Sequence, residues 1–346
     1  MIPHNRPDIG EDERLMVQQV MNGEWWTEGR ITELFEKALE EYLGAPTCVV
    51  NSGSSALMCA LLASGFKPND LVVVPAITYV ATAMIPLMLG ARVRLVDVDP
   101  ATFNMDHHKL RFCLAQHDVS FIIPVHIGGR ICEPFEHIEP RYTQWKIIQD
   151  SAQAMGAARE GCFSFQMTKQ LTTVEGGCIT SIDREFIDRC RRIKNYGRTG
   201  QVYIHDLVGS NFRTTDINSA IGLEQLRKID GFIKRRRDVL HRYYTELRGA
   251  PDRVGFQAEP ESPMFCFVMV DNKSAVLDQL QQAGIDARTI WPPLDVQPCL
   301  TSRLENGGGP NADYIYQHTI SLPLSNGITD EEVDTVIKEY NRIISA

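Results

Sequence analysis

The chain has 346 residues, 43% hydrophobic and 23% charged, a composition that is typical of folded globular proteins and excludes the disordered and fibrous classes. Its net charge of −9 excludes a general nucleic-acid-binding protein, because such a protein needs clustered positive charge. The nine cysteines are scattered and lack CxxC spacing, which favours reduced thiols over disulfides or a zinc site.

Targeting and membrane segments are not expected. The N-terminal sequence lacks an apolar core of signal-peptide length, and no later apolar run is long enough to span a membrane. We therefore expect a cytoplasmic protein whose partners include neither membranes nor nucleic acids, and which holds no metal.

Apolar residues at helical spacing predict two N-terminal helices, over 12–22 and 32–43. The loop between them, 23–30, is bounded by glycines and contains the adjacent Trp25 and Trp26. Such a loop can close over a site, but we interpret both indoles as filling a core or dimer contact.

Short β-rich runs then alternate with helical stretches. This alternation predicts βαβ units and a mainly parallel sheet with helices on both faces. Ligands bind to such sheets at the carboxyl ends of the strands, so the residues that follow each strand are the candidates for function. Strands are expected at 48–50, 71–74, 93–96, 121–125 and 146–148, and helices at 55–64 and 80–89.

The C-terminal part has a different pattern. A long helix is expected over 215–248, followed by a strand at 265–270 and helices over 274–283 and 330–344. We therefore predict a large domain of residues 1–235 and a smaller α+β domain of residues 236–346. The basic run 234–237 lies within the long helix and is interpreted as a solvated face or subunit contact.

Three candidate residues or turns follow the predicted strands. The small-residue turn 51–57 opens a helix, where backbone N–H groups form a phosphate cradle, although a plain helix cap has the same sequence. Tyr79 follows the second strand and can either stack on a flat ring or fill the interface between helix and sheet. His126 ends the fourth strand, and a structural role is favoured over a direct chemical one.

An acid and a lysine come next in chain order. Asp150 follows an apolar strand, Gln153 lies within reach of the same face, and Lys169 stands on a polar loop. Pyridoxal phosphate chemistry requires these two charged groups, because the lysine forms a Schiff base with the cofactor and the carboxylate keeps the pyridine nitrogen protonated. Any α/β protein has acids and lysines at such positions, so this pair alone does not identify a pyridoxal phosphate site. The phosphate turn and the aromatic residue that precede it in the chain make the site a stronger prediction.

These segments jointly resemble the sugar-nucleotide aminotransferases of the DegT/DnrJ/EryC1/StrS group, within the fold-type I pyridoxal phosphate enzymes. The resemblance runs nearly end to end and implies a large cofactor-binding domain with a mainly parallel mixed sheet and a smaller α+β domain. The matching segments are 51–57, 75–83 (Pro-x-x-Thr-Tyr-x-Ala-Thr-Ala), 124–126, 150–154 (Asp-Ser-Ala-Gln-Ala), 164–169 (Ser-Phe-x-x-x-Lys), 175–177 and 211–226.

The resemblance implies a role for each matching residue. Lys169 would hold pyridoxal 5'-phosphate, Asp150 would pair with the ring nitrogen, and Gln153 would lie near the ring hydroxyl. Tyr79 would stack on the ring. The family is homodimeric with shared sites, and the implied phosphate ligands are Gly53, Ser54, Ser164 and, from the partner subunit, Asn211.

This sequence departs from the family pattern at two places. The segment from Asp150 to Lys169 is shorter than usual, so the loop 156–163 is trimmed and the lysine is expected to approach the cofactor differently. Ser54 stands where the family usually has Thr, a change that keeps the hydroxyl.

The activity that the resemblance implies is transfer of an amino group from L-glutamate to a nucleotide-linked keto-sugar, with pyridoxamine phosphate as the intermediate form of the cofactor. The acceptor is expected to be a 4-keto-6-deoxyhexose used in deoxyaminosugar or surface polysaccharide biosynthesis. The alternatives are a 3-keto-sugar aminotransferase, a sugar dehydratase and a non-catalytic relative. The dehydratase is disfavoured because the simplest sugar dehydratases have histidine in place of the lysine, and here Lys169 is present. An NAD-dependent oxidoreductase is disfavoured because no GxGxxG follows the first strand.

Further candidates for contact with the substrate lie outside these motifs. Each candidate for the nucleotide diphosphate is more often an ordinary surface residue, and the two C-terminal candidates for contact with substrate more often pack. The diphosphate candidates are Arg30, Lys194, Tyr196, Arg198, Arg213 and Arg235, and the C-terminal candidates are Trp291 and His318.

Overall fold

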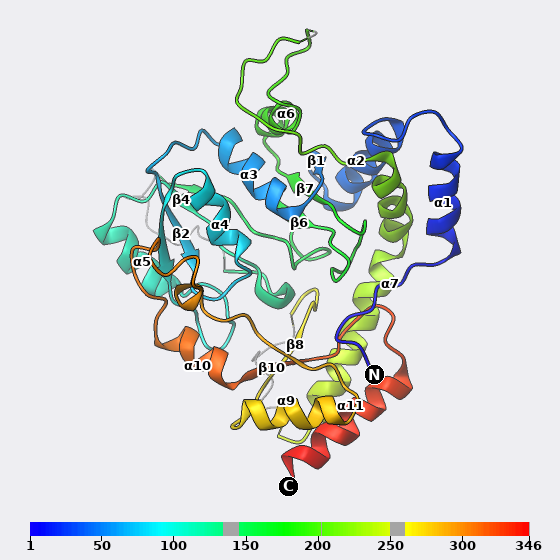
Figure 1. Ribbon diagram of the computed structural model, residues 1–346, viewed down its shortest axis with the longest axis vertical. Helices are drawn as coiled ribbons and strands as arrows, with labels where there is room; N and C mark the ends of the chain where they lie inside the picture. The colour runs from blue at the N-terminus through cyan, green and yellow to red at the C-terminus, as the bar shows by residue number, and fades with distance from the viewer. Residues whose placement is uncertain (134–144, 202, 250–259, 346) are drawn as a thin grey trace.

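Four parallel strands form the sheet at the centre of the larger lobe of the computed structural model (Figure 1), which describes residues 1–133, 145–201, 203–249 and 260–345. Their order is β3 (Arg92–Val96), β2 (Leu71–Pro75), β4 (Phe121–Ile122) and β5 (Lys146–Ile147). Every residue of β2 is buried, as expected for a strand that is covered on both faces. This accounts for the unbroken apolar run in its sequence.

An antiparallel sheet continues the same lobe. Its order is β1 (Thr47–Val50), β7 (Gly177–Thr180) and β6 (Gly161–Ser164). Asp150 forms single bridges to Val125 on one side and to Cys162 on the other, and so joins the two sheets. The large domain thus has a mixed sheet with a parallel centre, and the predicted fold class is confirmed.

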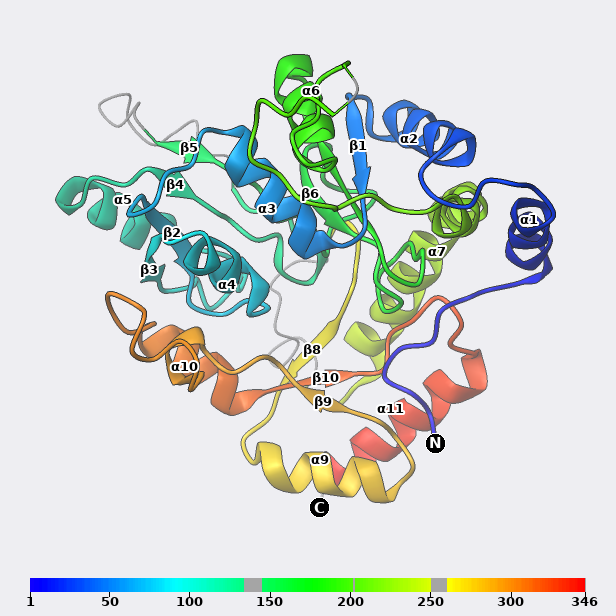
Figure 2. The same ribbon diagram turned by 45° about the horizontal axis from the view of Figure 1, so that its top comes forward.

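Helices cover both sheets (Figure 2). The helix α3 packs against α4, α6 and the antiparallel strands, while α1 and α2 pack against the long α7. These helices are α1 (Glu11–Met21), α2 (Arg30–Leu43), α3 (Gly53–Ala63), α4 (Ala81–Met88), α5 (His107–Gln116), α6 (Arg184–Ile193) and α7 (Asp216–Glu246).

The smaller lobe is an antiparallel sheet backed by helices. Its strands run in the order β8 (Cys266–Met269), β10 (Thr319–Leu322) and β9 (Arg288–Thr289). The helices α9 (Lys273–Gln282) and α11 (Asp330–Ile344) pack against each other, and α9 contacts β10. A further helix, α10 (Pro310–His318), lies beside the larger lobe and buries Ile315 in its core.

The helix α7 passes from one core to the other. Ile229 and Ile233 belong to a core of the large lobe, whereas Val239 and Leu240 belong to the core of the small lobe. The predicted boundary at residue 235 falls within α7, between these two sets of residues, and stays a prediction. The N-terminal residues differ from that division, because Ile2 pairs with Ile285 and packs on the small lobe.

Three local expectations differ from the structure. The expected strand 121–125 is a regular strand only over Phe121–Ile122, and Val125 rejoins it through a single bridge to Asp150 in the same register. Pro124, which lies between them, has no N–H to donate to the sheet. The segment 156–163 is not wholly a loop, since it contains the start of β6. The basic run 234–237 is not simply a solvated face, because Arg236 is fully buried.

No helix in the described part of the chain is long and apolar enough to cross a membrane.

Candidate active site

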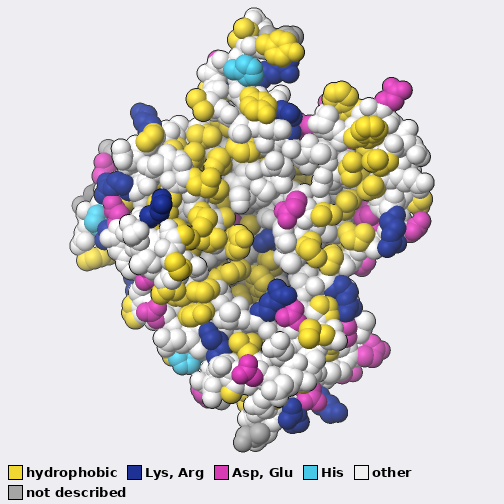
Figure 3. Space-filling view, in the orientation of Figure 1, with side chains coloured by type: hydrophobic (Ala, Val, Ile, Leu, Met, Phe, Trp, Pro, Cys, Tyr) yellow, Lys and Arg dark blue, Asp and Glu magenta, His cyan; other side chains and the backbone are white. Residues whose placement is uncertain are grey.

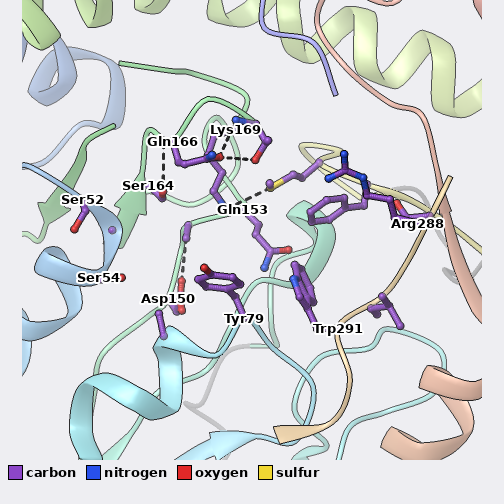
Figure 4. A pocket seen from close by; sticks show the side chains of 18 of the residues that line it. Ser52, Ser54, Tyr79, Asp150, Gln153, Ser164, Gln166, Lys169, Arg288 and Trp291 are labelled. Carbon is purple, nitrogen blue, oxygen red and sulfur yellow. Dashed lines mark hydrogen bonds between the residues drawn. The ribbon is translucent and has the colours of Figure 1, made fainter. Parts of the chain in front are cut away.

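A cavity of about 460 Å³ lies where the strand ends of the large lobe meet β8, β9 and β10 of the small lobe. Figure 3 shows hydrophobic side chains gathered over the middle of this face, and Figure 4 shows Asp150, Tyr79, Lys169 and Trp291 around one space. Of the eight predicted site residues, the seven that line this cavity are Gly53, Ser54, Tyr79, Asp150, Gln153, Ser164 and Lys169.

Asp150 is held rigidly at the junction of the two sheets. Its Oδ2 accepts a hydrogen bond from Thr82 Oγ1 at 2.9 Å, and its Oδ1 accepts one from the backbone N–H of Ala152 at 3.2 Å. Burial raises the pKa of this carboxyl, while Thr82, Ala152 and the charge of Lys169 act to lower it. A cationic group in the cavity would therefore be well matched to this carboxylate.

Lys169 reaches the cavity from the turn after β6. Its Nζ lies 3.9 Å from Met264 Sδ, and the residue is partly buried. Burial lowers its pKa to about 8, with Asp150 acting to raise the value and Arg236 acting to lower it. With this pKa, about one amine in ten is the neutral nucleophile at pH 7, a far larger share than in an exposed lysine.

The turn before α3 has the shape of an anion cradle. Ser52 caps the helix by accepting the N–H of Ser55 at 3.1 Å, and the helix begins at Gly53. A Cβ on Gly53 would lie 2.8 Å from the Cβ of Ser164, so only glycine lets these chain segments approach so closely. Helix N–H groups and the hydroxyls of Ser54 and Ser164 therefore surround one position suited to a phosphate.

Tyr79 and Gln153 complete the large-lobe wall. Tyr79 is 58% exposed and its ring lies beside Asp150 in the open cavity (Figure 4), so it does not fill the interface between helix and sheet. The Gly128 N–H donates to Gln153 Oε1 at 2.8 Å, which leaves the Nε2 amide hydrogens available to an oxygen in the cavity. This is the donor that a phenolic oxygen on a bound ring would need.

The small-lobe wall contains residues that the sequence did not identify. Arg288 lines the cavity and forms an ion pair with Asp286 at 2.7 Å. His4 reaches the same wall, with its Nε2 2.9 Å from Ser321 Oγ, and burial followed by the charge of Arg288 lowers its pKa to about 4. Neither residue stands in a recognisable motif, so only the tertiary structure identifies them.

The remaining candidates lie elsewhere. Asn211 is absent from the cavity lining, and its Oδ1 accepts the N–H of Arg213 at 3.3 Å. His126 is structural, because its Nδ1 accepts the N–H of Cys132 at 3.0 Å and burial lowers its pKa. His318 bonds to the Tyr314 carbonyl rather than facing the cavity.

The six basic or polar candidates for a diphosphate site are dispersed, and Arg30 is an exposed residue at the start of α2. Lys194 is buried and forms ion pairs with Glu28 and Glu36, each at 3.0 Å, so it is not a free surface cation. Arg235 pairs with Asp330 at 2.8 Å on the surface. The others near the chain turn 195–213 line a second hollow with Trp25, and these are Tyr196, Arg198 and Arg213.

The shortened segment between Asp150 and Lys169 does not separate the two residues. A turn at Gly156 and the strand β6 carry the chain back to the cavity, where both side chains appear in the lining. Thr82, in contrast, belongs to the motif 75–83 but received no role from the sequence. Its spacing of four residues from Thr78 was the signal that could have indicated a shared hydroxyl contact.

The buried acid, the partly buried lysine, the phosphate cradle and the mixed sheet together define a fold-type I pyridoxal phosphate enzyme. The chain belongs to the DegT/DnrJ/EryC1/StrS aminotransferase family, whose sequence pattern matches residues 7–341. It is accordingly a pyridoxal phosphate-dependent sugar aminotransferase.

Individual relatives are similar to this chain over nearly its whole length. GDP-perosamine synthase of Caulobacter vibrioides is 31% identical and covers 98% of this chain and 97% of its own. Two solved forms of the putative sugar aminotransferase Spr1654 from Streptococcus pneumoniae have similar folds. The PMP form has a TM-score of 0.90 and 26% sequence identity, and the match covers 100% of this chain and 99% of that protein. The PLP form has a TM-score of 0.91 and 28% sequence identity, and the match covers 99% of this chain and 98% of that protein.

The residues present fit this cofactor. Bound pyridoxal phosphate supplies an aldehyde for covalent attachment of an amine and a ring that delocalises negative charge. Lys169 would attach to it and, when released, would move a proton as a general base; Asp150 would hold the ring nitrogen protonated. Gln153 would donate to the ring oxygen, and the turn at Gly53 would bind the phosphate.

Proposed function

We propose that this enzyme transfers an amino group from L-glutamate to a nucleotide-linked keto-sugar, a 4-keto-6-deoxyhexose. The observation that carries the proposal is the presence of buried Asp150 and partly buried Lys169 in one cavity with a phosphate cradle. The relative named GDP-perosamine synthase supports a nucleotide-linked acceptor. Arg288 is the second cation in the described lining, besides Lys169, and suits an acidic donor.

The absorption spectrum of the cofactor-loaded protein tests the donor. The visible band should bleach on addition of L-glutamate and return when a nucleotide-linked 4-keto-6-deoxyhexose is added. Lys169→Ala should show no normal bleaching, because it lacks both the attachment point and the base. A wild-type band that persists with L-glutamate would reject this donor, and recovery with only a 3-keto-sugar would favour the other acceptor.

We also propose a homodimer with shared sites. Asn211 is exposed and outside its own cavity, as expected if it serves the site of a second copy. Large apolar side chains are exposed nearby on the loops 23–30 and 195–210. They are Trp25, Trp26, Tyr196, Tyr203, Ile204 and Val208. Trp25 and Trp26 are therefore not core residues in the single chain, and a dimer contact would cover them.

Mixing two weakly active variants tests the shared site. Lys169→Ala and Asn211→Ala should each have little activity alone, because every site carries one lesion. After subunit exchange, a heterodimer would hold one site with both lesions and one intact site, so about a quarter of wild-type activity should return. Mixtures that stay as inactive as the parents would show that Asn211 does not serve a partner's site.

We further propose the cytoplasm as its location. All nine cysteines are unpaired, and eight of them are buried. A reducing compartment suits such thiols, since nothing in the fold depends on their oxidation. Fractionation that recovers the native protein outside the cytoplasm would overturn this placement.

A further inference from the structure

A buried pair of threonine hydroxyls lies directly behind the catalytic carboxylate. Thr82 Oγ1 is 2.9 Å from Asp150 Oδ2 and 2.9 Å from Thr78 Oγ1. It is also 3.1 Å from the backbone carbonyl oxygen of Tyr79. Thr78 and Thr82 are each at most 1% exposed, and neither lines the cavity, so they touch no substrate.

Hydrogen counting limits what Thr82 can do. Its hydroxyl has one hydrogen but three oxygen neighbours, so it cannot donate to Asp150 and to the Tyr79 carbonyl at the same time. When Asp150 is ionised, Thr82 donates to it and Thr78 can donate to Thr82. When Asp150 carries a proton, it can donate to Thr82, whose hydrogen then turns to the Tyr79 carbonyl.

We propose that Thr82, supported by Thr78, is a positioning residue that keeps Asp150 ionised and aimed at the ring nitrogen of the cofactor. The two described donors to Asp150 are Thr82 on Oδ2 and Ala152 on Oδ1, one for each oxygen. They fix the rotation of the carboxylate and leave its remaining lone pairs toward the cavity. A charged acceptor that loses one of two donors in a buried site is destabilised in its ionised form.

The proton on the ring nitrogen is the decisive observable. In wild-type protein loaded with cofactor labelled with ¹⁵N in the pyridine ring, the nitrogen resonance should report the protonated form. In Thr82→Val, which keeps the shape of the side chain but removes the donor, the proton should shift toward Asp150 and the resonance toward the unprotonated position. The first half-reaction with an amino donor should slow by about 10- to 100-fold.

Three further variants separate positioning from packing. Thr82→Ser restores the hydroxyl and should return the wild-type resonance. Thr78→Val should give a smaller change in the same direction. Thr180→Val is the matched control, because it removes a buried threonine hydroxyl that pairs with Thr47 at 3.1 Å outside the cavity. It should cost stability and leave the resonance unchanged.

None of these variants removes a titratable group. Among the described residues, Lys169 and Cys162 interact with the charge of Asp150, and both are present in every variant. A protonated ring nitrogen and wild-type half-reaction rate in Thr82→Val would overturn the inference. If that variant does not fold, Thr82→Ala makes the same test without adding a methyl group.

The inference rests on the cofactor chemistry of the proposed function but not on its substrates. The nitrogen resonance is read before any donor is added, so a wrong choice of L-glutamate or of keto-sugar leaves this test intact. Failure of the wild-type band to bleach with any amino acid counts against the proposed function. A wild-type protein that binds no cofactor overturns both.

Discussion

Lys169 is partly buried and Asp150 is buried, and loss of contact with water disfavours the charged form of each. Their opposite charges partly offset this cost, since each acts on the other's pKa in favour of ionisation. The pKa of Lys169 nevertheless stays near 8, well below that of an exposed lysine. The side chain is therefore poised for nucleophilic attack near physiological pH.

This pKa predicts how the apo protein captures its cofactor. Only the neutral amine attacks an aldehyde, so the capture rate should rise about tenfold per pH unit below 8 and level off above it. Stopped-flow absorbance from pH 6.5 to 9.5 measures it, with a free lysine derivative as control for the cofactor's own ionisation. A rate that still rises steeply above pH 9 would indicate an ordinary lysine.

His4 predicts a pH-dependent part of stability. Burial and the nearby Arg288 lower its pKa to about 4 in the folded protein, while an unfolded histidine titrates near 6.5. Between these values the unfolded state binds more protons, so the free energy of unfolding should rise with pH through this window by up to about 3 kcal/mol. Below it, protonation of His4 costs this stability.

Comparison with His4→Gln isolates the contribution. Urea unfolding gives the free energy of unfolding of both proteins at pH 4.5 and pH 7. When the change with pH in one protein is subtracted from that in the other, the contributions of the carboxylates cancel. The substitution should reduce the gain in stability on going from the lower to the higher pH. Equal pH dependence in the two proteins would show that His4 is not held neutral.

At the scale of elements, the turn after β4 joins the two lobes through the backbone. The Ser262 N–H donates to the Gly129 carbonyl at 3.2 Å, and the Met264 N–H donates to the Gly128 carbonyl at 2.9 Å. Gly129 has a φ of +88°, and a Cβ there would lie 1.7 Å from Ser262 O. The close approach of two backbones therefore requires glycine.

Gly129→Ala should lower the free energy of unfolding by more than about 3 kcal/mol, because either the backbone contact or the turn must give way. Gly44→Ala is the control: Gly44 has a φ of +79° with nothing within 4 Å of an added Cβ, so only backbone strain of about 1 kcal/mol is expected. Urea midpoints measure both. Equal losses would mean that the steric contact at Gly129 relaxes freely.

At the scale of the whole molecule, the N-terminal residues connect the small lobe to the lysine turn. Ile2 donates its N–H to the Gly284 carbonyl at 2.7 Å, and Asn5 Nδ2 donates to the carbonyl of Thr168, the neighbour of Lys169, at 2.8 Å. Figures 1 and 2 show the N-terminus beside the small lobe. The extended N-terminal chain thereby crosses the boundary between the lobes.

Asn5→Ala should weaken cofactor binding about fivefold, because the Lys169 turn loses one hydrogen bond that orients it. Arg6→Ala is the control, since Arg6 pairs with Glu332 away from the cavity and should affect only stability. Titration of the apo proteins with cofactor, followed by absorbance, measures both. The same affinity in Asn5→Ala and wild type would show that the turn is held without this contact.

Much of the fold follows from local sequence. Apolar runs with turns predicted β1 and β2, because strands buried on both faces require unbroken apolar sequence. The β-rich run 93–96 predicted β3, although Arg94 interrupts its apolar residues. Helical periodicity predicted α2 and α11 closely, and α11 has a capping box at Thr329 that marks its start. The strands β6 and β9 escaped prediction, because their short sequences carry no pattern until a neighbour pairs with them.

The sequence by itself determined the half of the candidate site that we assign to the cofactor. Gly53, Tyr79, Asp150 and Lys169 follow secondary structure elements in chain order, and parallel strands necessarily bring their carboxyl ends to one edge. Only the tertiary structure decided the other half, because packing of the small lobe brings Arg288 to that edge from far along the chain. It also decided which polar residues are buried partners, such as Thr82 and Arg236, since burial depends on contacts that no local pattern encodes.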